Sequence, residues 1–360
     1  MASNTEAVLQ RQRAIAPVMP ERDPRIDAAK GVAIVLVVLG HAKGIPSWFT
    51  VLAYSFHVPL FFVLSGWLSD RRDAYSLRQL LDTLVRTLLV PYVFFFLVAY
   101  AYWLLTRNIG EKALRWGQLP WWDPLIGLLS GIGPQLYVHP ALWFLPALFV
   151  TALAYQLLRR VLQPEMIALL SLPPALAWIL AFPGAGLRLP FALDVLPVAL
   201  LYYAVGAVAG RSASLPRSMW VGCTAALLIA VPWLLLAWSN GRVDINQLRF
   251  GATAWKFLIA SLLGTSVVLL ASPLAAQSAV LRWIGRNTLL ILCTHILVFF
   301  ALSGVAALAG LFPAGTKPGA EWAVTVSIFS IALCVPMRWV LLRYAPWALG
   351  LRNETVGAAA

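Results

Sequence analysis

Long apolar segments alternate with short polar stretches along nearly the whole chain. Ten of these segments have about the 20 residues that a helix needs to cross a bilayer. They are residues 29–46, 49–68, 80–105, 141–162, 165–182, 191–210, 218–238, 252–272, 283–311 and 320–342. The pattern predicts an all-α, polytopic integral membrane protein with about ten transmembrane helices around a central cavity. Residues 25–345 would then form one transmembrane domain between polar tails at 1–24 and 346–360.

The composition agrees with this prediction. Of the 360 residues, 61% are hydrophobic and only 11% are charged, which leaves too little polar surface to cover a soluble globule. The 16 tryptophans and 10 tyrosines suit helix ends at the two interfaces with membrane lipids. A net charge of +13 would suggest a nucleic-acid partner in a soluble protein. Here its placement in the loops indicates membrane topology, and no nucleic acid is expected.

The positive charges are divided unevenly between the two sides of the predicted helices. Eighteen of the 27 lysines and arginines fall on the side that also holds both chain ends when ten spans are counted. Positive residues accumulate in cytoplasmic loops. We therefore expect both tails to be cytoplasmic. Residues 1–24 lack the apolar core of a signal peptide, which agrees with that side for the N-terminal tail.

Several chemistries lack the residues that they need. Cys223, Cys293 and Cys334 are isolated in predicted spans, which argues against disulfides and cysteine-based metal sites. The four histidines have no matching set of carboxylates within the spans, so we expect no metal. The chain has no Walker-type phosphate loop and no G-x-G-x-x-G motif, which argues against a pump that hydrolyses ATP at its own site.

The first two apolar segments carry a lysine and two histidines at depths where lipid favours apolar side chains. Lys30 and His41 are eleven positions apart, which places them on one helical face, roughly 16 Å apart along the axis. If the chain turns near Pro46, His57 returns to within roughly 6 Å of the depth of His41. Ionisable groups at such depths are costly to bury and are usually functional. His41 and His57 are therefore the candidates for catalysis.

Further polar residues accompany these two histidines. His295 in the ninth segment is expected at a comparable depth. A single buried histidine is more often a packing residue than a catalyst, but three at one level favour a shared site. The cations at the predicted cytoplasmic rim either bind an anionic cofactor or only set the topology. They are Arg25, Lys30, Arg71, Arg72, Arg78 and Arg86.

Five motifs in order resemble those of the acyltransferase 3 family, which are integral membrane proteins that O-acylate sugars. Lys30, ten intervening residues and His41 are similar to the family's Arg/Lys-x10-His motif. The others are FHVPLFFVLSGWL (56–68), the basic-then-VPY segment (86–92), LWFLPALF (142–149) and IGRNTLLILCTH (284–295). The similarity extends over nearly the whole chain, from residue 22 to residue 343. Within the family the chain looks most similar to the fucose-4-O-acetylase-like group, which includes exopolysaccharide acetyltransferases.

The resemblance implies an O-acetyltransferase of the bacterial inner membrane. It would move an acetyl group from cytoplasmic acetyl-CoA to a sugar hydroxyl of an exported or cell-surface polysaccharide, or of its lipid-linked oligosaccharide precursor. His41 would be the general base, because the pKa of histidine is near neutrality. His57, Ser65 or a backbone N–H would stabilise the oxyanion. The CoA phosphates would bind Lys30, Arg25, Arg86, Arg71 and Arg72, and the acceptor would contact Ser65, Trp143 and His295.

The chain departs from some family members in two respects. Lysine rather than arginine stands at position 30, so a bidentate contact with phosphate is replaced by a point charge. No hydrolase-like domain follows the last span, so we expect the protein to acylate its acceptor itself.

Two other functions fit parts of the pattern. A proton-coupled transporter of a small metabolite or glycan precursor would use the histidines as a relay, although the inverted repeats typical of transporters are not evident. A structural membrane subunit would leave the aligned Lys30 and His41 unexplained. The polar excursion at 106–139, with three tryptophans, either stacks on sugar rings or anchors the chain to lipid head groups.

The distribution of positive charge predicts which loops are cytoplasmic. Cysteines introduced at Arg160 and Arg217 should react with a membrane-impermeant maleimide only from the cytoplasmic side. Cysteines within residues 111–118 should react only from the other side. Labelling in intact cells and in inverted vesicles measures both, and the reverse pattern would exclude the ten-span topology.

Overall fold

The computed structural model describes residues 22–73, 75–182, 187–311 and 318–352. The α-helices of these residues are α2 (Pro24–His41), α3 (Ser47–Tyr54), α4 (His57–Trp67), α5 (Leu77–Leu84), α6 (Val90–Thr106), α7 (Glu111–Trp116), α8 (Asp123–Ser130), α9 (Phe144–Leu158), α10 (Pro164–Ala181), α11 (Leu196–Ser212), α12 (Met219–Asn240), α13 (Ala254–Ala275), α14 (Ala279–Arg286), α15 (Thr288–Leu308) and α16 (Ala320–Tyr344).

Shorter elements join these helices. The 3₁₀ turns are η1 (Ser69–Arg72), η3 (Gly133–Gln135), η4 (Pro140–Trp143), η5 (Pro190–Ala192), η6 (Ile245–Gln247) and η7 (Pro346–Leu349), and η2 (Val85–Leu89) is a π-helical turn. Two very short strands, β1 (Val243–Asp244) and β2 (Arg249–Phe250), pair antiparallel with Val243 opposite Phe250. The predicted all-α, polytopic membrane fold is confirmed.

Nine helical segments of the described residues are long and apolar enough to cross a membrane. They correspond to nine of the ten predicted spans, and they are Ser47–Trp67, Leu77–Thr106, Pro140–Leu158, Pro164–Ala181, Pro190–Ser212, Met219–Asn240, Ala254–Ala275, Thr288–Ala307 and Ala320–Tyr344. The span Pro164–Ala181 is one continuous helix in spite of Pro173 and Pro174 inside it.

The first predicted span, 29–46, is helix α2, and its predicted limits are wrong by five residues at each end. It begins at Pro24 because the Asp23 carboxylate accepts the backbone N–H of Arg25 and caps the helix. It ends at His41, and Gly44 in the following turn has a φ of +99°. The earlier start brings Arg25, Asp27 and Lys30 into the first two turns, so α2 is less apolar than the other nine segments.

The second predicted span consists of two helices, α3 and α4. Their junction lies at Ser55 and Phe56, and α4 begins at His57. Pro59 explains the break, because within a continuous helix its ring would clash with the carbonyl of Ser55. The proline therefore places His57 at the start of a helix instead of in the middle of one.

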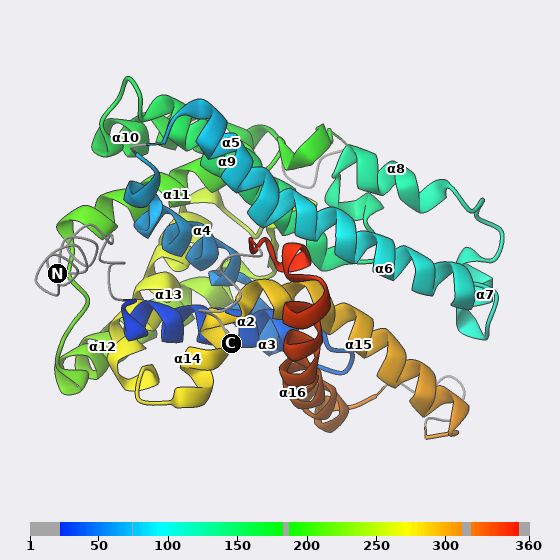
Figure 1. The fold of residues 1–360 in the computed structure, drawn as a ribbon. Coiled ribbons are helices and arrows are strands. Elements are labelled where there is room, and N and C mark those ends of the chain that lie inside the picture. The colour runs from blue at the N-terminus through cyan, green and yellow to red at the C-terminus, as the bar shows by residue number, and fades with distance from the viewer. Residues whose placement is uncertain (1–21, 74, 183–186, 312–317, 353–360) are drawn as a thin grey trace, which may run out of the picture.

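Helix α2 lies in the interior of the bundle. It contacts α4, α13, α14, α15 and α16, whereas α12 and α16 lie at the periphery (Figure 1). Its polar first turns are satisfied within the protein, since the carboxylate of Asp27 accepts from Nε of Arg286 at 2.9 Å. Gly285 lets α14 approach closely at this point, because a Cβ there would lie 1.7 Å from the Asp27 carbonyl oxygen.

Helices α4 and α11 are packed backbone to backbone. A Cβ on Gly66 would lie 1.9 Å from the carbonyl oxygen of Tyr203, and one on Gly206 would lie 2.0 Å from that of Val63. Small residues allow such close approach between membrane helices. This contact fixes α4, which carries His57 and Ser65, against the rest of the bundle.

We expect Gly206→Ala to destabilise the protein. Alanine normally favours a helix over glycine by about 1 kcal/mol. Here the added methyl group must separate α4 and α11, and overpacking of this kind costs about 1–3 kcal/mol. Thermal unfolding of the purified protein in detergent should show a lower melting temperature.

Gly304→Ala in α15 is the matched control for this change. A Cβ at Gly304 would meet its nearest neighbour, the Tyr102 hydroxyl, at an ordinary 3.7 Å. Its melting temperature should equal or exceed that of the wild type. Equal melting temperatures for the two variants would contradict the role assigned to the α4–α11 contact.

Candidate functional site

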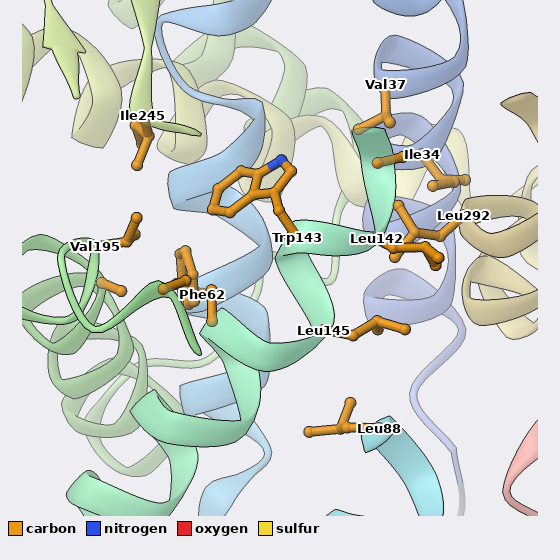
Figure 2. Packing of buried hydrophobic residues seen from close by; sticks show 14 of the residues in the cluster. Ile34, Val37, Phe62, Leu88, Leu142, Trp143, Leu145, Val195, Ile245 and Leu292 are labelled. Atoms are coloured by element: carbon orange, nitrogen blue, oxygen red, sulfur yellow. The ribbon is translucent and has the colours of Figure 1, made fainter. Parts of the chain in front are cut away.

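A cavity of about 690 Å³ lies beside α2 and extends along its length. Its wall is formed by α2, α4, α9, α15, the π-helical turn η2, the turn η4 and the loop between α12 and α13. Figure 2 shows apolar residues of this wall around the Trp143 indole. They include Ile34, Val37, Leu88, Leu145, Ile245 and Leu292.

One end of the cavity is basic. Arg22, Lys30 and Arg72 line it, and Ser65 lies in the same wall. These residues meet because α2 and α4 are antiparallel, so the beginning of α2 lies beside the end of α4. An Arg72 Nη lies 3.4 Å from the Tyr203 hydroxyl, which holds this cation against α11. Three cations at one end of a cavity could bind a polyanion.

The other end of the cavity contains His41 and His57. Nδ1 of His41 lies 2.8 Å from the carbonyl oxygen of Val37, and Nδ1 of His57 lies 2.7 Å from that of Ala53. A carbonyl oxygen only accepts, so in each neutral ring Nδ1 carries the hydrogen and Nε2 carries the lone pair. Both Nε2 atoms can therefore accept a proton from a bound molecule.

Tyr54 joins these two histidines. Its hydroxyl donates to the carbonyl oxygen of Gly40 at 3.1 Å, and its ring lies edge-on to the His57 ring at 4.7 Å between centroids. Tyr54 also lines the cavity. It therefore holds the end of α2, where His41 lies, next to the start of α4, where His57 lies.

Two further histidines lie behind His41. The His295 ring lies 5.2 Å from the His41 ring, and the His139 ring lies 6.5 Å from the His295 ring. Both are fully buried. Nδ1–H of His295 donates to Ile291, and Nε2–H of His139 donates to Cys293. Nε2 of His295 has no hydrogen-bond partner among the described residues.

A short polar segment forms part of the wall at the histidine end. Asp244, Asn246 and Gln247 line the cavity there, and they belong to the β1–η6–β2 hairpin. Oδ1 of Asp244 accepts the backbone N–H of Gln247 at 3.3 Å. Burial raises the pKa of the Asp244 carboxyl, and the Gln247 N–H and the charges of Arg242 and Arg249 partly oppose this.

The structure brings six of the ten predicted site residues into the cavity wall. They are Lys30, His41, His57, Ser65, Arg72 and Trp143. Among the described residues, Arg25, Arg86 and His295 are not part of that wall. The side chain of Arg71 lies outside what the structure describes.

Arg25 and Arg86 have structural contacts instead. Arg25 pairs with Asp23 at 2.7 Å and donates to the Leu215 carbonyl at 2.8 Å, which ties the start of α2 to the loop before α12. Arg86 donates to the Gly350 carbonyl at 2.5 Å. It therefore holds the segment after α16 against η2, whose residues Thr87 and Leu88 line the cavity.

The sequence did not single out several residues that the structure places at the site. Arg22 lies in the predicted N-terminal tail and so was counted only as a topology signal. His139 lies in the polar excursion that was expected at the outer surface. The hairpin residues, such as Asp244 and Asn246, lie in a loop between two spans. One feature of the sequence could have indicated His139. It is followed by Pro140, at the point where the apolar segment 141–162 begins.

No metal centre is evident in the described residues, which contain no group of three or more histidine, cysteine, aspartate or glutamate side chains that could hold a metal ion. The arrangement instead combines a basic end, an apolar passage and an end with two imidazoles whose Nε2 atoms can accept a proton. Such a cavity can hold a long molecule whose charged and reactive parts are separated.

Comparison with known proteins identifies one relationship. Residues 23–339 match the model of a protein family described as an acyltransferase domain. The matched region begins at the cap of α2 and includes most of the cavity wall. No curated protein and no solved structure matches the chain.

Proposed function

This chain belongs to the acyltransferase 3 family and is thus a membrane acyltransferase, and we propose that it moves an acetyl group from acetyl-CoA to a sugar hydroxyl. One observation supports the proposal most directly. A single cavity has cations at one end and two imidazoles with available lone pairs at the other.

The donor would bind with its phosphates at the basic end. Lys30, Arg22 and Arg72 supply the positive charge there, and a lysine binds phosphate as a point charge. From Lys30 to His41 the helix rises roughly 16 Å. The pantetheine arm would lie along the apolar wall between them and bring the thioester carbonyl to the histidine end.

His41 would act as the general base in the transfer. Its Nε2 takes the proton of the acceptor hydroxyl while the hydroxyl oxygen bonds to the thioester carbonyl carbon. When the tetrahedral intermediate collapses, the C–S bond breaks and the imidazolium returns the proton to the CoA sulfur. The products are the O-acetyl ester and the free CoA thiol, and His41 is neutral again.

The hydrogen-bond pattern narrows the choice of oxyanion donor. The hydrogen of neutral His57 is already donated to Ala53, so this ring would have to be protonated before it could donate to an oxyanion. Ser65 is eight residues further along α4, roughly 12 Å from His57, and faces the donor end. A backbone N–H or protonated His57 therefore fits this role better than Ser65 does.

His295 would position the base. It is buried against the His41 ring and does not reach the cavity wall, so it acts through His41 and not on the substrate. Packing that fixes the orientation of a catalytic ring is part of the preorganisation that enzymes need. The sequence predicted that His295 contacts the acceptor. In this proposal His295 contacts His41 instead.

The acceptor would be a sugar of an exported or cell-surface polysaccharide or of its lipid-linked oligosaccharide precursor. The Trp143 indole in the cavity wall offers a flat apolar face on which a sugar ring can stack. The fucose-4-O-acetylase-like resemblance favours this class of acceptor. The protein would lie in the bacterial inner membrane with both termini in the cytoplasm. Cytoplasmic acetyl-CoA would then have access to the basic end of the cavity.

Lys30→Ala should weaken acetyl-CoA binding without unfolding the protein. A charge-assisted contact contributes about 1.5–3 kcal/mol, which corresponds to an increase in Kd of about 10–150-fold. Lys30→Arg should retain most of the affinity. Isothermal titration of the purified protein with acetyl-CoA gives the Kd values.

Lys43→Ala provides the control, because Lys43 is exposed and lies outside the cavity wall. Its affinity for acetyl-CoA should equal that of the wild type. If the Lys30→Ala variant binds acetyl-CoA as tightly as the wild type does, Lys30 serves only as a topology signal. A wild-type protein that does not bind CoA at all would favour the proton-coupled transporter.

His41→Gln should fold and bind acetyl-CoA but lose about 10²–10⁴-fold in turnover. Glutamine keeps a hydrogen bond to Val37 within reach but cannot accept the proton. His57→Gln should cost less if His57 orients the substrate. Acetyl transfer, measured at several pH values with binding in parallel, tests this. Near-normal turnover by a well-folded His41→Gln protein would remove His41 from the mechanism.

A further inference from the structure

The loop between α12 and α13 folds inward as a hairpin and forms part of the cavity wall. Val243, Ile245, Leu248 and Phe250 are buried in the core of the bundle. Their burial leaves the intervening polar residues of the hairpin facing the cavity. A surface loop that only joins two spans has no need of such an apolar anchor.

Hydrogen bonds hold the hairpin in a defined position. Asn240 at the end of α12 donates through Nδ2 to the Phe250 carbonyl at 2.9 Å and accepts from the Thr253 N–H at 3.1 Å. Arg188 donates to the Asn246 carbonyl at 2.8 Å. The Asn246 side chain fits because residue 133 is glycine, where a Cβ would lie 1.6 Å from Oδ1 of Asn246.

The hairpin lies at the histidine end of the cavity. Strand β1 contacts α3, whose last residue, Tyr54, packs against His57. Three cavity-lining side chains of the hairpin can form hydrogen bonds, namely Asp244, Asn246 and Gln247. Oδ1 of Asn246 is buried against Gly133, which fixes the side chain of this residue at the cavity wall.

The charged residues of the cavity wall differ between its two ends. Arg22, Lys30 and Arg72 are the cations of the described cavity wall and lie at its far end, while Asp244 is the acidic residue of the wall. A carboxylate beside two neutral amides can accept hydrogen bonds from hydroxyls. The amide groups both donate and accept, as sugar hydroxyls do.

We propose that Asp244, Asn246 and Gln247 form the acceptor subsite and bind the ring hydroxyls of a neutral sugar beside His41 and His57. The sugar then enters from the end of the bundle where α12 and α13 are joined, opposite to the entrance for acetyl-CoA. The inference rests on the proposed acetyl transfer for its reaction and adds the residues that select the acceptor and the side from which it arrives.

Cysteine protection tests the subsite without any turnover. Gln247→Cys is made in a Cys223→Ser background, since Cys293 and Cys334 are buried. The protein in lipid nanodiscs is alkylated with a maleimide in the presence of octyl glucoside, octyl galactoside or octyl mannoside below their micellar concentrations. An octyl oligoethylene glycol, which has the same chain but no sugar ring, is the control ligand.

At least one octyl glycoside should slow alkylation of the Gln247→Cys protein by about tenfold, and the glycol control should not. Free CoA should protect a Ser65→Cys protein, at the donor end, more than it protects Gln247→Cys. Protection of Gln247→Cys by CoA and by no glycoside would overturn the proposal. If a glycoside protects Gln247→Cys in a protein that does not bind CoA, the sugar site is supported and the proposed acetyl transfer is refuted.

Kinetic constants give a second, independent test. For the glycoside that protects best, Asn246→Ala and Asp244→Asn should raise KM for the glycoside by about tenfold and leave the Kd for acetyl-CoA unchanged. Thr253→Ala, which alters an exposed side chain just after the same hairpin and outside the cavity wall, is the matched control. An unchanged glycoside KM in both cavity variants would contradict the assignment.

Discussion

The burial of polar side chains inside an apolar helix bundle is the constraint on which this structure depends. In a membrane interior each such group needs a partner from the protein itself, because water does not supply one. Helix α2 meets this need along its whole length. Asp27 pairs with Arg286, and His41 donates to a carbonyl of its own helix. Tyr54 donates to the last turn of α2.

These partners also determine what the site can do. Because Nδ1 of His41 and of His57 is used for a backbone hydrogen bond, the tautomer is set and Nε2 is left to accept a proton. The same contacts that stabilise the fold therefore orient the two imidazoles. Lys30, at the far end of the cavity, lies roughly 16 Å from His41 along α2, so the cavity separates its cations from its imidazoles.

Close helix packing gives the cavity its fixed walls. Gly66 and Gly206 bring α4 against α11, and Gly285 brings α14 against α2. The segment after α16 is held to η2 through Arg86 and Gly350, next to cavity residues Thr87 and Leu88. The arginine that the sequence suggested as a phosphate ligand is thus used to position a wall of the cavity.

The sequence by itself determined the membrane fold, nearly all of its spans and the placement of Lys30 and His41 on one helical face. These follow from hydrophobic segment length and from the 3.6-residue helical period, which are local properties of the chain. Only the tertiary structure decided that His139 packs behind His295, and that a hairpin from a loop near residue 245 reaches the histidine end. It also decided that Arg25 and Arg86 donate hydrogen bonds to the backbone carbonyls of Leu215 and Gly350. Such pairings join residues 100 or more positions apart, and they depend on which helices pack together, which no local period encodes.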